Sequence, residues 1–176
     1  MYHLRPAASF DIPSLRLLIE QSVRGLSAGY YSPAQIEAAL EHVFGVDTQL
    51  IVDGTYFVAE VEGTLVAAGG WSRRRTHYGG DQMKSADDPL IDAATEPARI
   101  RAFFVHPAWS RRGLGRSLFE RCLASARAGG FHALELVATL PGEPLYAALG
   151  FEARERFAVM LPNGVELPLT RMSRTI

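Results

Sequence analysis

The chain has 176 residues, of which 48% are hydrophobic and 21% charged, and its formal net charge is −1. This length suits a single domain, residues 1–176, with enough chain to bury a substantial core. The balanced charge excludes the basic field that drives non-specific nucleic-acid binding, and no apolar segment of the sequence is long enough to span a membrane.

Cys122 is the one cysteine in the sequence, so the chain cannot form an internal disulfide. The N-terminus also lacks the basic and apolar regions of a secretion signal. These two features predict a cytoplasmic protein in a reducing compartment. Cys122 lies on the apolar stripe of an expected helix, where a cysteine is more often a small hydrophobic residue than a nucleophile.

The first half of the chain predicts a strand, two helices and a hairpin. Asp11 and Pro13 begin the first helix, apolar residues follow at helical spacing, and Gly25 lies near its end. Ser32-Pro33 supplies an N-cap and a first-turn proline for the second helix. The expected strands are Tyr2 to Arg5, Tyr56 to Val61 and Thr64 to Trp71, the last two joined by the turn Glu62-Gly63.

The segment from Arg73 to Glu96 is polar and contains Gly79-Gly80 and Asp87-Asp88-Pro89. It is too long for an ordinary connection between two strands. It therefore predicts a functional or mobile loop directly before the central strand.

The central stretch changes from a strand pattern to a helix pattern. Ile100 to Val105 is apolar and aromatic, and His106-Pro107 ends it because proline has no amide donor. From Gly113 onward the apolar residues lie four apart, which predicts a half-buried helix that ends at Gly129-Gly130. The sequence thus predicts a strand, a glycine-containing turn and an amphipathic helix.

The turn from Ser110 to Arg116 has the composition of an anion site. Its glycines let the backbone approach a ligand, while unpaired amides at the helix start point outward. Arg111, Arg112 and Arg116 add charge-assisted donors that suit phosphate oxygens. A diphosphate is therefore a better candidate ligand than a carboxylate.

The last third of the chain predicts a strand, a short helix and a closing hairpin. The strand is Phe131 to Ala138, the helix runs from Pro141 to Leu149, and the hairpin turns at Asn163-Gly164. The order of elements implies an α/β protein in which helices cover a mixed sheet. A doubly wound dinucleotide fold fits this order less well because it needs repeated strand-helix units.

The strand, its Val-x-Pro stop, the Arg-Arg-Gly-x-Gly turn and the helix together resemble the coenzyme A site of the GNAT superfamily of N-acetyltransferases. The segment Pro144 to Phe151 is similar to a second part of that family's pattern. The resemblance implies a GNAT-like fold, with a mostly antiparallel sheet, a splayed parallel strand pair, and helices on both faces. Ser110 stands where the family has Gln or Arg, and Pro141 where an asparagine is frequent.

The resemblance also implies a set of site residues and acetyl-CoA as the co-substrate. Tyr146 stands where relatives commonly carry the tyrosine that protonates the departing thiolate, a reaction for which a phenol has the necessary proton. No metal is expected, and His77 has no spaced partner for one. The residues expected to bind coenzyme A are Phe103, Phe104, Val105, Arg111, Arg112, Gly113, Leu114, Gly115, Arg116 and Ser117.

The base that accepts the amine's proton stays open between Glu60, Glu135, His106 and water, because Arg101 stands near the place where many relatives have a strand glutamate. Two further sets of residues have both a functional and a structural interpretation. Arg99 and Arg101 could face an acidic substrate group, but ion pairing with nearby acids is favoured. Tyr30, Tyr31 and Trp71 could wall an acceptor pocket, or they could pack in the core or cover a helix junction.

The sequence therefore predicts an N-acetyltransferase that moves the acetyl group of acetyl-CoA directly to a primary amine of a small molecule or a peptide. The first alternative is a catalytically silent sensor of coenzyme A, and the second is a nucleotide-binding enzyme. A small-molecule amine is the expected partner, with neither nucleic acid nor a membrane involved. An exposed sheet edge is a candidate surface for a homodimer.

Overall fold

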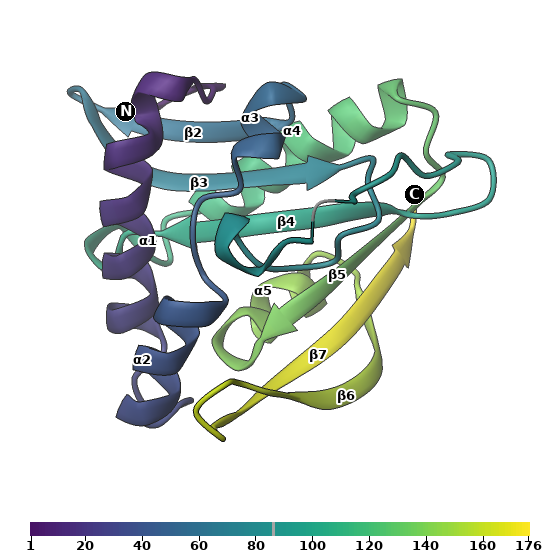
Figure 1. Cartoon of the computed structure of the whole chain (residues 1–176). Helices are drawn as coiled ribbons and strands as arrows, with labels where there is room; N and C mark the ends of the chain where they lie inside the picture. The colour runs from purple at the N-terminus through teal and green to yellow at the C-terminus, as the bar shows by residue number, and fades with distance from the viewer. Residues whose placement is uncertain (86) are drawn as a thin grey trace.

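A computed structural model describes residues 1–85 and 87–176, so Ala86, inside the predicted loop Arg73 to Glu96, lies outside the described residues. The described chain contains seven strands and five α-helices (Figure 1). In chain order they are β1 (His3–Pro6), α1 (Ile12–Leu26), α2 (Pro33–His42), α3 (Thr48–Val52), β2 (Tyr56–Val61), β3 (Thr64–Ser72), β4 (Ala98–Val105), α4 (Leu114–Ala128), β5 (Ala133–Thr139), α5 (Glu143–Ala148), β6 (Glu152–Met160) and β7 (Glu166–Thr175).

The strands form one sheet in the order β1-β2-β3-β4-β5-β7-β6. Neighbouring strands are antiparallel except for β4 and β5, which pair in parallel at Ala98–Leu134 and Arg99–Glu135. Beyond these two pairs the strands separate, and β5 leads into the part of the sheet formed with β7 and β6 (Figure 1). The predicted mostly antiparallel sheet with a splayed parallel pair is therefore confirmed.

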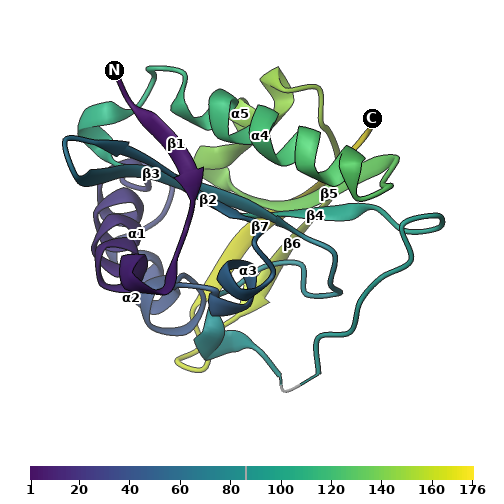
Figure 2. The same ribbon diagram turned by 90° about the horizontal axis from the view of Figure 1, so that it is seen from above.

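Helices cover both faces of the sheet, as predicted (Figure 2). On one face, α4 and α5 pack on a core that includes Leu118, Phe119 and Leu136. On the other face, α1, α2 and α3 pack on a second core that includes Leu15 and Leu18. The sheet is thus the middle layer of three, and each face has its own buried apolar cluster.

A β-bulge interrupts β4 at Ala102. Phe104 pairs with Ala68 and Arg101 pairs with Gly70, so Ala102 and Phe103 together face Gly69. Ala102 has a φ of 56°. Before the bulge, Ile100 packs on the α4–α5 side; after it, Ala102 and Phe104 pack on the α1–α2 side. The extra residue therefore reverses the alternation of side chains along the strand.

The local signals read from the sequence have the expected structural roles. The Ser32 hydroxyl accepts a hydrogen bond from the Gln35 N–H, and the Gln35 side chain accepts one from the Ser32 N–H, at the start of α2. The predicted helices and strands are all present, and α3 is the α-helix that sequence reasoning missed. Across residues 1–85 and 87–176, no helix combines the length and apolar character needed to cross a bilayer.

Candidate active site at the split between β4 and β5

The turn before α4 leaves several backbone amides without partners. Gly113 caps the helix with a φ of 82°, and no side chain caps the first turn. The first helical hydrogen bond runs from the Ser117 N–H to the Gly113 carbonyl. Within the described residues, the N–H groups of Leu114, Gly115 and Arg116 therefore have no acceptor. Free amides at the positive end of a helix dipole form an anion site.

The two glycines of this turn act differently. A Cβ on Gly113 would meet no atom within 4 Å, so this residue faces open space and supplies the positive φ of the turn. A Cβ on Gly115 would lie 2.8 Å from Cδ2 of Leu145, so Gly115 lets α4 approach α5 closely. Open space thus remains beside the free amides, while the helix itself is tightly packed.

The cationic side chains of the turn are exposed, as a site for a soluble anion requires. Arg111, Arg112 and Arg116 are all exposed, and the Arg112 guanidinium lies 4.9 Å from the centre of the Trp109 ring. Arg111 and Arg116 form no ion pair with any carboxylate in the described chain. Ser117 is less free, because its hydroxyl lies 2.6 Å from the hydroxyl of Tyr2, the residue before β1.

A cavity of about 220 Å³ lies where β4 and β5 separate, and we call it the split-sheet cavity. Phe103 and Tyr146 line it from the α4–α5 side, whereas Phe104 and Val137 line it from the α1–α2 side. The cavity therefore passes through the plane of the sheet. Leu145, the side chain that Gly115 approaches, is also part of its wall, so the cavity adjoins the turn before α4.

Tyr146 lines this cavity and is held there by aromatic packing. Its ring packs edge-on against Phe103 and Phe151, with centroids 6.1 and 5.9 Å away. Among the described residues no hydrogen-bond partner of the hydroxyl is found. Burial raises the pKa of Tyr146, so the phenol is protonated at neutral pH and has a hydrogen to donate.

The backbone amides of β4 are not equally free. The Val105 N–H donates a hydrogen bond to Oγ of Ser22 on α1, at 3.1 Å, so it points away from β3 and is already occupied. N–H groups two residues apart in a strand point the same way, which directs the Phe103 N–H toward the cavity as well. The bulge leaves Phe103 without a register partner in β3. Phe103 is therefore the strand residue whose N–H is expected to face the cavity.

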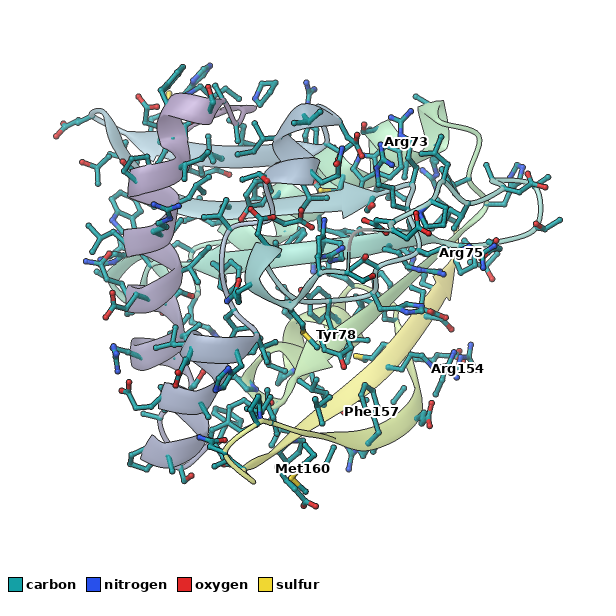
Figure 3. All side chains as sticks on the ribbon, in the orientation of Figure 1. Arg73, Arg75, Tyr78, Arg154, Phe157 and Met160 are labelled. Atoms are coloured by element: carbon teal, nitrogen blue, oxygen red, sulfur yellow. The ribbon has the colours of Figure 1, made fainter. Side chains whose placement is uncertain are left out.

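The loop between β3 and β4, residues 73–97, forms the cavity wall on the α1–α2 side through His77, Tyr78, Gly79 and Gly80. Tyr78 lies beside Phe157 of β6, with ring centroids 6.4 Å apart (Figure 3). The described part of this loop is thus fastened to a distant strand. Its residues 77–80 enclose the cavity.

A buried ion-pair cluster holds the same loop against the sheet. Arg101 donates hydrogen bonds to Asp47 Oδ2 at 2.8 Å, to the Thr76 carbonyl at 3.0 Å and to the Gly79 carbonyl at 2.7 Å. Asp47 Oδ1 also accepts a hydrogen bond from Lys84 Nζ at 2.5 Å. Desolvation lowers the pKa of Arg101, and the Asp47 carboxylate opposes that shift. Arg101 is therefore a structural ion-pair residue, which confirms the interpretation that the sequence favoured.

The three candidate bases have different surroundings. Glu60 pairs with Arg5 at 2.8 Å on β2, away from the cavity lining. His106 accepts a hydrogen bond at Nδ1 from the Ala108 N–H, so it serves as a local cap. Glu135 lies 2.9 Å from Nε2 of His77, a residue that lines the cavity. Of the three candidates, Glu135 is thus the one connected to the cavity.

The aromatic residues proposed as an acceptor wall are not gathered at the cavity. Tyr30 is exposed, and Trp71 is buried edge-on against Phe131 in the α4–α5 core. Tyr31 is buried, donates to the Pro168 carbonyl and accepts from the Leu140 N–H, so it joins the α1–α2 connection to the sheet. Core packing is therefore correct for Tyr31 and Trp71, whereas Tyr30 lies neither in a core nor at the cavity. The wall is instead formed by residues such as Phe44 and Tyr78.

Within the described residues, the cysteine and the possible metal ligands do not form a second candidate site. Cys122 is buried in the α4–α5 core, and its burial raises the pKa of the thiol, which keeps it protonated and unreactive. In residues 1–85 and 87–176, no group of three or more His, Cys, Asp or Glu side chains could hold a metal ion. Sequence reasoning missed Ser22 and His77 as cavity residues, because their partners are far away in the chain.

Comparisons with known proteins place this geometry in a family. Among solved structures, a GCN5-related N-acetyltransferase from Rhodopseudomonas palustris is 23% identical, with 99% of this chain and 95% of that chain covered and a TM-score of 0.72. The PaiA N-acetyltransferase of Thermoplasma acidophilum, in complex with coenzyme A, is 13% identical with a TM-score of 0.69, covering 100% of this chain and 99% of that one. A phosphinothricin acetyltransferase from Sinorhizobium meliloti, in complex with acetyl-CoA, is 21% identical with a TM-score of 0.65, covering 99% and 88%.

The comparison with curated proteins found no significant match. The structural similarities, all below 25% identity, establish the fold. At the level of sequence, the model of the acetyltransferase (GNAT) family matches residues 22–151, which include the split-sheet cavity, the turn before α4 and Tyr146. The chain therefore belongs to the GNAT family of acetyltransferases.

Proposed function

We propose that this protein is an N-acetyltransferase that moves the acetyl group of acetyl-CoA directly to a primary amine of a small molecule. The observation that carries the proposal is the junction of two features. Free amides at the start of α4 adjoin a cavity that passes through the sheet. An anion site beside a narrow apolar passage suits a ligand whose diphosphate is joined by a thin arm to a thioester.

The residues at the turn before α4 fit the diphosphate of coenzyme A. Leu114, Gly115 and Arg116 would donate backbone N–H groups, and Arg111 and Arg116 are exposed to pair with phosphate oxygens. The open space at Gly113 is where the phosphates would approach the backbone. The splayed edge of β4, from Phe103 to Val105, would lie along the pantetheine arm. When bound, acetyl-CoA supplies an activated acetyl group as a thioester.

Two groups of the chain are positioned to assist transfer at the cavity. The Phe103 N–H, which the bulge takes out of register with β3, would donate a hydrogen bond to the thioester oxygen as that oxygen gains charge. Tyr146 would donate its proton to the departing sulfur. The Val105 amide, already bonded to Ser22, keeps α1 against β4 and so fixes the width of the passage.

The cavity supports a small amine as the acceptor. Its volume of about 220 Å³ leaves room for the reacting ends of two molecules but not for a bulky group. Aromatic and aliphatic side chains on the α1–α2 side, such as Phe44, Tyr78 and Val137, favour an amine carried on an apolar body. Arg101 is buried, its charge is paired with Asp47, and it donates to two carbonyls, so it is not positioned as the partner of a substrate carboxylate.

The release of free thiol from acetyl-CoA, measured across a panel of primary amines, tests the proposal. Replacing Tyr146 by Phe should lower kcat on the order of a hundredfold, because the proton donor is lost. The affinity for acetyl-CoA, measured by calorimetry, should change little. Tyr30→Phe is the matched control, since Tyr30 is exposed and lies outside the cavity lining. Saturable coenzyme A binding without turnover of any amine would contradict the proposed activity.

A further inference from the structure

His77 is a cavity residue with a charged partner behind it. It lines the split-sheet cavity on the α1–α2 side, and its Nε2 lies 2.9 Å from Oε1 of Glu135. Glu135 is itself held by Arg99 at 3.6 Å and by Arg171 at 3.2 Å. When the Nε2–H of a neutral imidazole donates to a carboxylate, Nδ1 is unprotonated and can accept a proton.

The chain on both sides of His77 is fixed by the buried cluster. Arg101 holds the carbonyl of Thr76, the residue before His77, and the carbonyl of Gly79, two residues after it. The Thr76 N–H donates to Oδ1 of Asp88 at 2.9 Å. Arg101 is only 3% exposed and its carboxylate partner Asp47 is fully buried, so this attachment is rigid. Arg101 is thus a positioning residue for His77.

The two faces of the cavity carry complementary groups. Tyr146 belongs to the α4–α5 side, whereas Glu135 points to the opposite side, because its neighbours Leu134 and Leu136 pack in the α4–α5 core. His77 contacts Glu135 and lies on that opposite side as well. A proton donor and a proton acceptor therefore approach the cavity from opposite faces of the sheet.

From this geometry we infer that His77, paired with Glu135, is the general base that takes the proton from the acceptor amine. The inference rests on the proposed acetyl transfer. It deepens that proposal by naming the group that completes the reaction. It also assigns the α1–α2 side of the cavity to the amine and the α4–α5 side to the thiol.

These two residues account for every proton that moves during the transfer. The nitrogen of the neutral amine bonds to the carbonyl carbon of the thioester, and the carbon–sulfur bond breaks. Nδ1 of His77 takes the proton that nitrogen loses, and the resulting imidazolium is stabilised by Glu135. The sulfur gains a proton through Tyr146. His77 then releases its proton to solvent and Tyr146 regains one, so both residues return to their starting state.

The charges around His77 favour its neutral form. Partial burial and the Arg99 guanidinium lower the pKa of His77, with a smaller contribution from Arg171, while Glu135 opposes the shift. An ordinary histidine has a pKa of about 6.5, so His77 should be neutral and able to accept a proton at pH 7. Turnover should therefore rise with pH along a limb centred below about 6.5 and then level off.

The test compares pH profiles of kcat for the wild type, His77→Gln, Glu135→Gln and His132→Gln, with the best amine of the panel. His77→Gln should lose about 100-fold in kcat near pH 7 and should no longer show the acidic limb. Glu135→Gln should shift that limb to lower pH, because the carboxylate that raises the His77 pKa is gone. His132 is exposed and should behave as wild type.

NMR titration of the imidazole of His77 in the wild-type protein gives a result that does not depend on a folded variant. A pKa at or below about 6.5 is expected, and protonation persisting above pH 7 would overturn the assignment. Unchanged kcat and an unchanged limb in His77→Gln would also refute it, with the acetyltransferase proposal still standing. A wild type that binds acetyl-CoA but acetylates no amine would refute both.

Discussion

Replacing Asp47 by Ala should be among the most damaging single changes outside the two apolar cores. Asp47 is fully buried and pairs with Arg101, whose side chain is 2% exposed, and with Lys84. It also accepts a hydrogen bond from the Gln49 N–H at the start of α3. The substitution would leave the Arg101 guanidinium buried without its carboxylate and would remove a helix cap.

The expected loss can be estimated from these two contributions. Breaking a buried ion pair from one side costs about 3–5 kcal/mol, and losing an N-cap costs about 1 kcal/mol. For a chain of this length, about 5 kcal/mol corresponds to a fall in Tm of roughly 10–20 °C. Because whole domains are stable by only about 5–15 kcal/mol, Asp47→Asn, which retains a cap oxygen, should be prepared in parallel.

Asp53→Ala is the matched control for this experiment. Asp53 follows α3 directly and pairs with Arg74, but Arg74 is 24% exposed, so the pair is partly solvated. Its loss should cost about 1 kcal/mol. Thermal melts and urea titrations of the three variants provide the measurement. If Asp47→Ala lowers Tm by no more than Asp53→Ala does, the buried cluster does not hold the loop as described, and the positioning of His77 loses its support.

Two further outcomes test the cofactor site and the acid stability of the fold. Gly113→Val should weaken coenzyme A binding at least tenfold. The control is Gly164→Val in the β6–β7 turn, where the glycine has a similar positive φ and equally open surroundings; it should impose a comparable backbone strain of roughly 1–2 kcal/mol and leave binding intact. Equal affinities of the two variants, measured by calorimetry, would contradict the placement of the phosphates. The hydrogen bond and charge of Arg5 lower the pKa of Asp11, so this pair stabilises the protein above about pH 4 and that contribution is lost as the pH falls toward the folded-state value. Urea titrations at pH 6 and pH 3 should show a smaller decrease for Arg5→Met than for the wild type, and equal decreases would show that the pair does not contribute.

Local sequence signals were sufficient to predict the features that depend on residues close together in the chain. Ser32-Pro33 began α2, Gly129 followed the end of α4, and Asn163-Gly164 turned the last hairpin. The apolar periodicity after Gly113 placed α4 correctly because its buried stripe faces one core. The helix α3 was missed because five residues are too few to show a period.

The parts of the site that escaped prediction depend on residues far apart in sequence. Arg101 and Asp47 are 54 positions apart, so nothing near Arg101 indicated that its charge holds the β3–β4 loop. His77 was considered only as a metal ligand, since its partner Glu135 lies on a strand that follows the whole cofactor segment. The positive φ of Ala102 carries no glycine signal. The candidate base was therefore sought on the strands and beside the turn at His106 rather than on the β3–β4 loop.

The bulge at Ala102 also limits how the length of the chain can change. Arg101 and Ala102 lie on the same face, so deleting Ala102 would remove the bulge, leave Phe103 to Val105 on their present faces and place Phe103 opposite Gly69 in β3. The Phe103 N–H would then enter the ladder with β3, and the cavity would lose the strand amide directed toward it. Insertions and deletions among relatives should consequently fall in the connecting segments, while the number of residues between Arg101 and His106 stays constant.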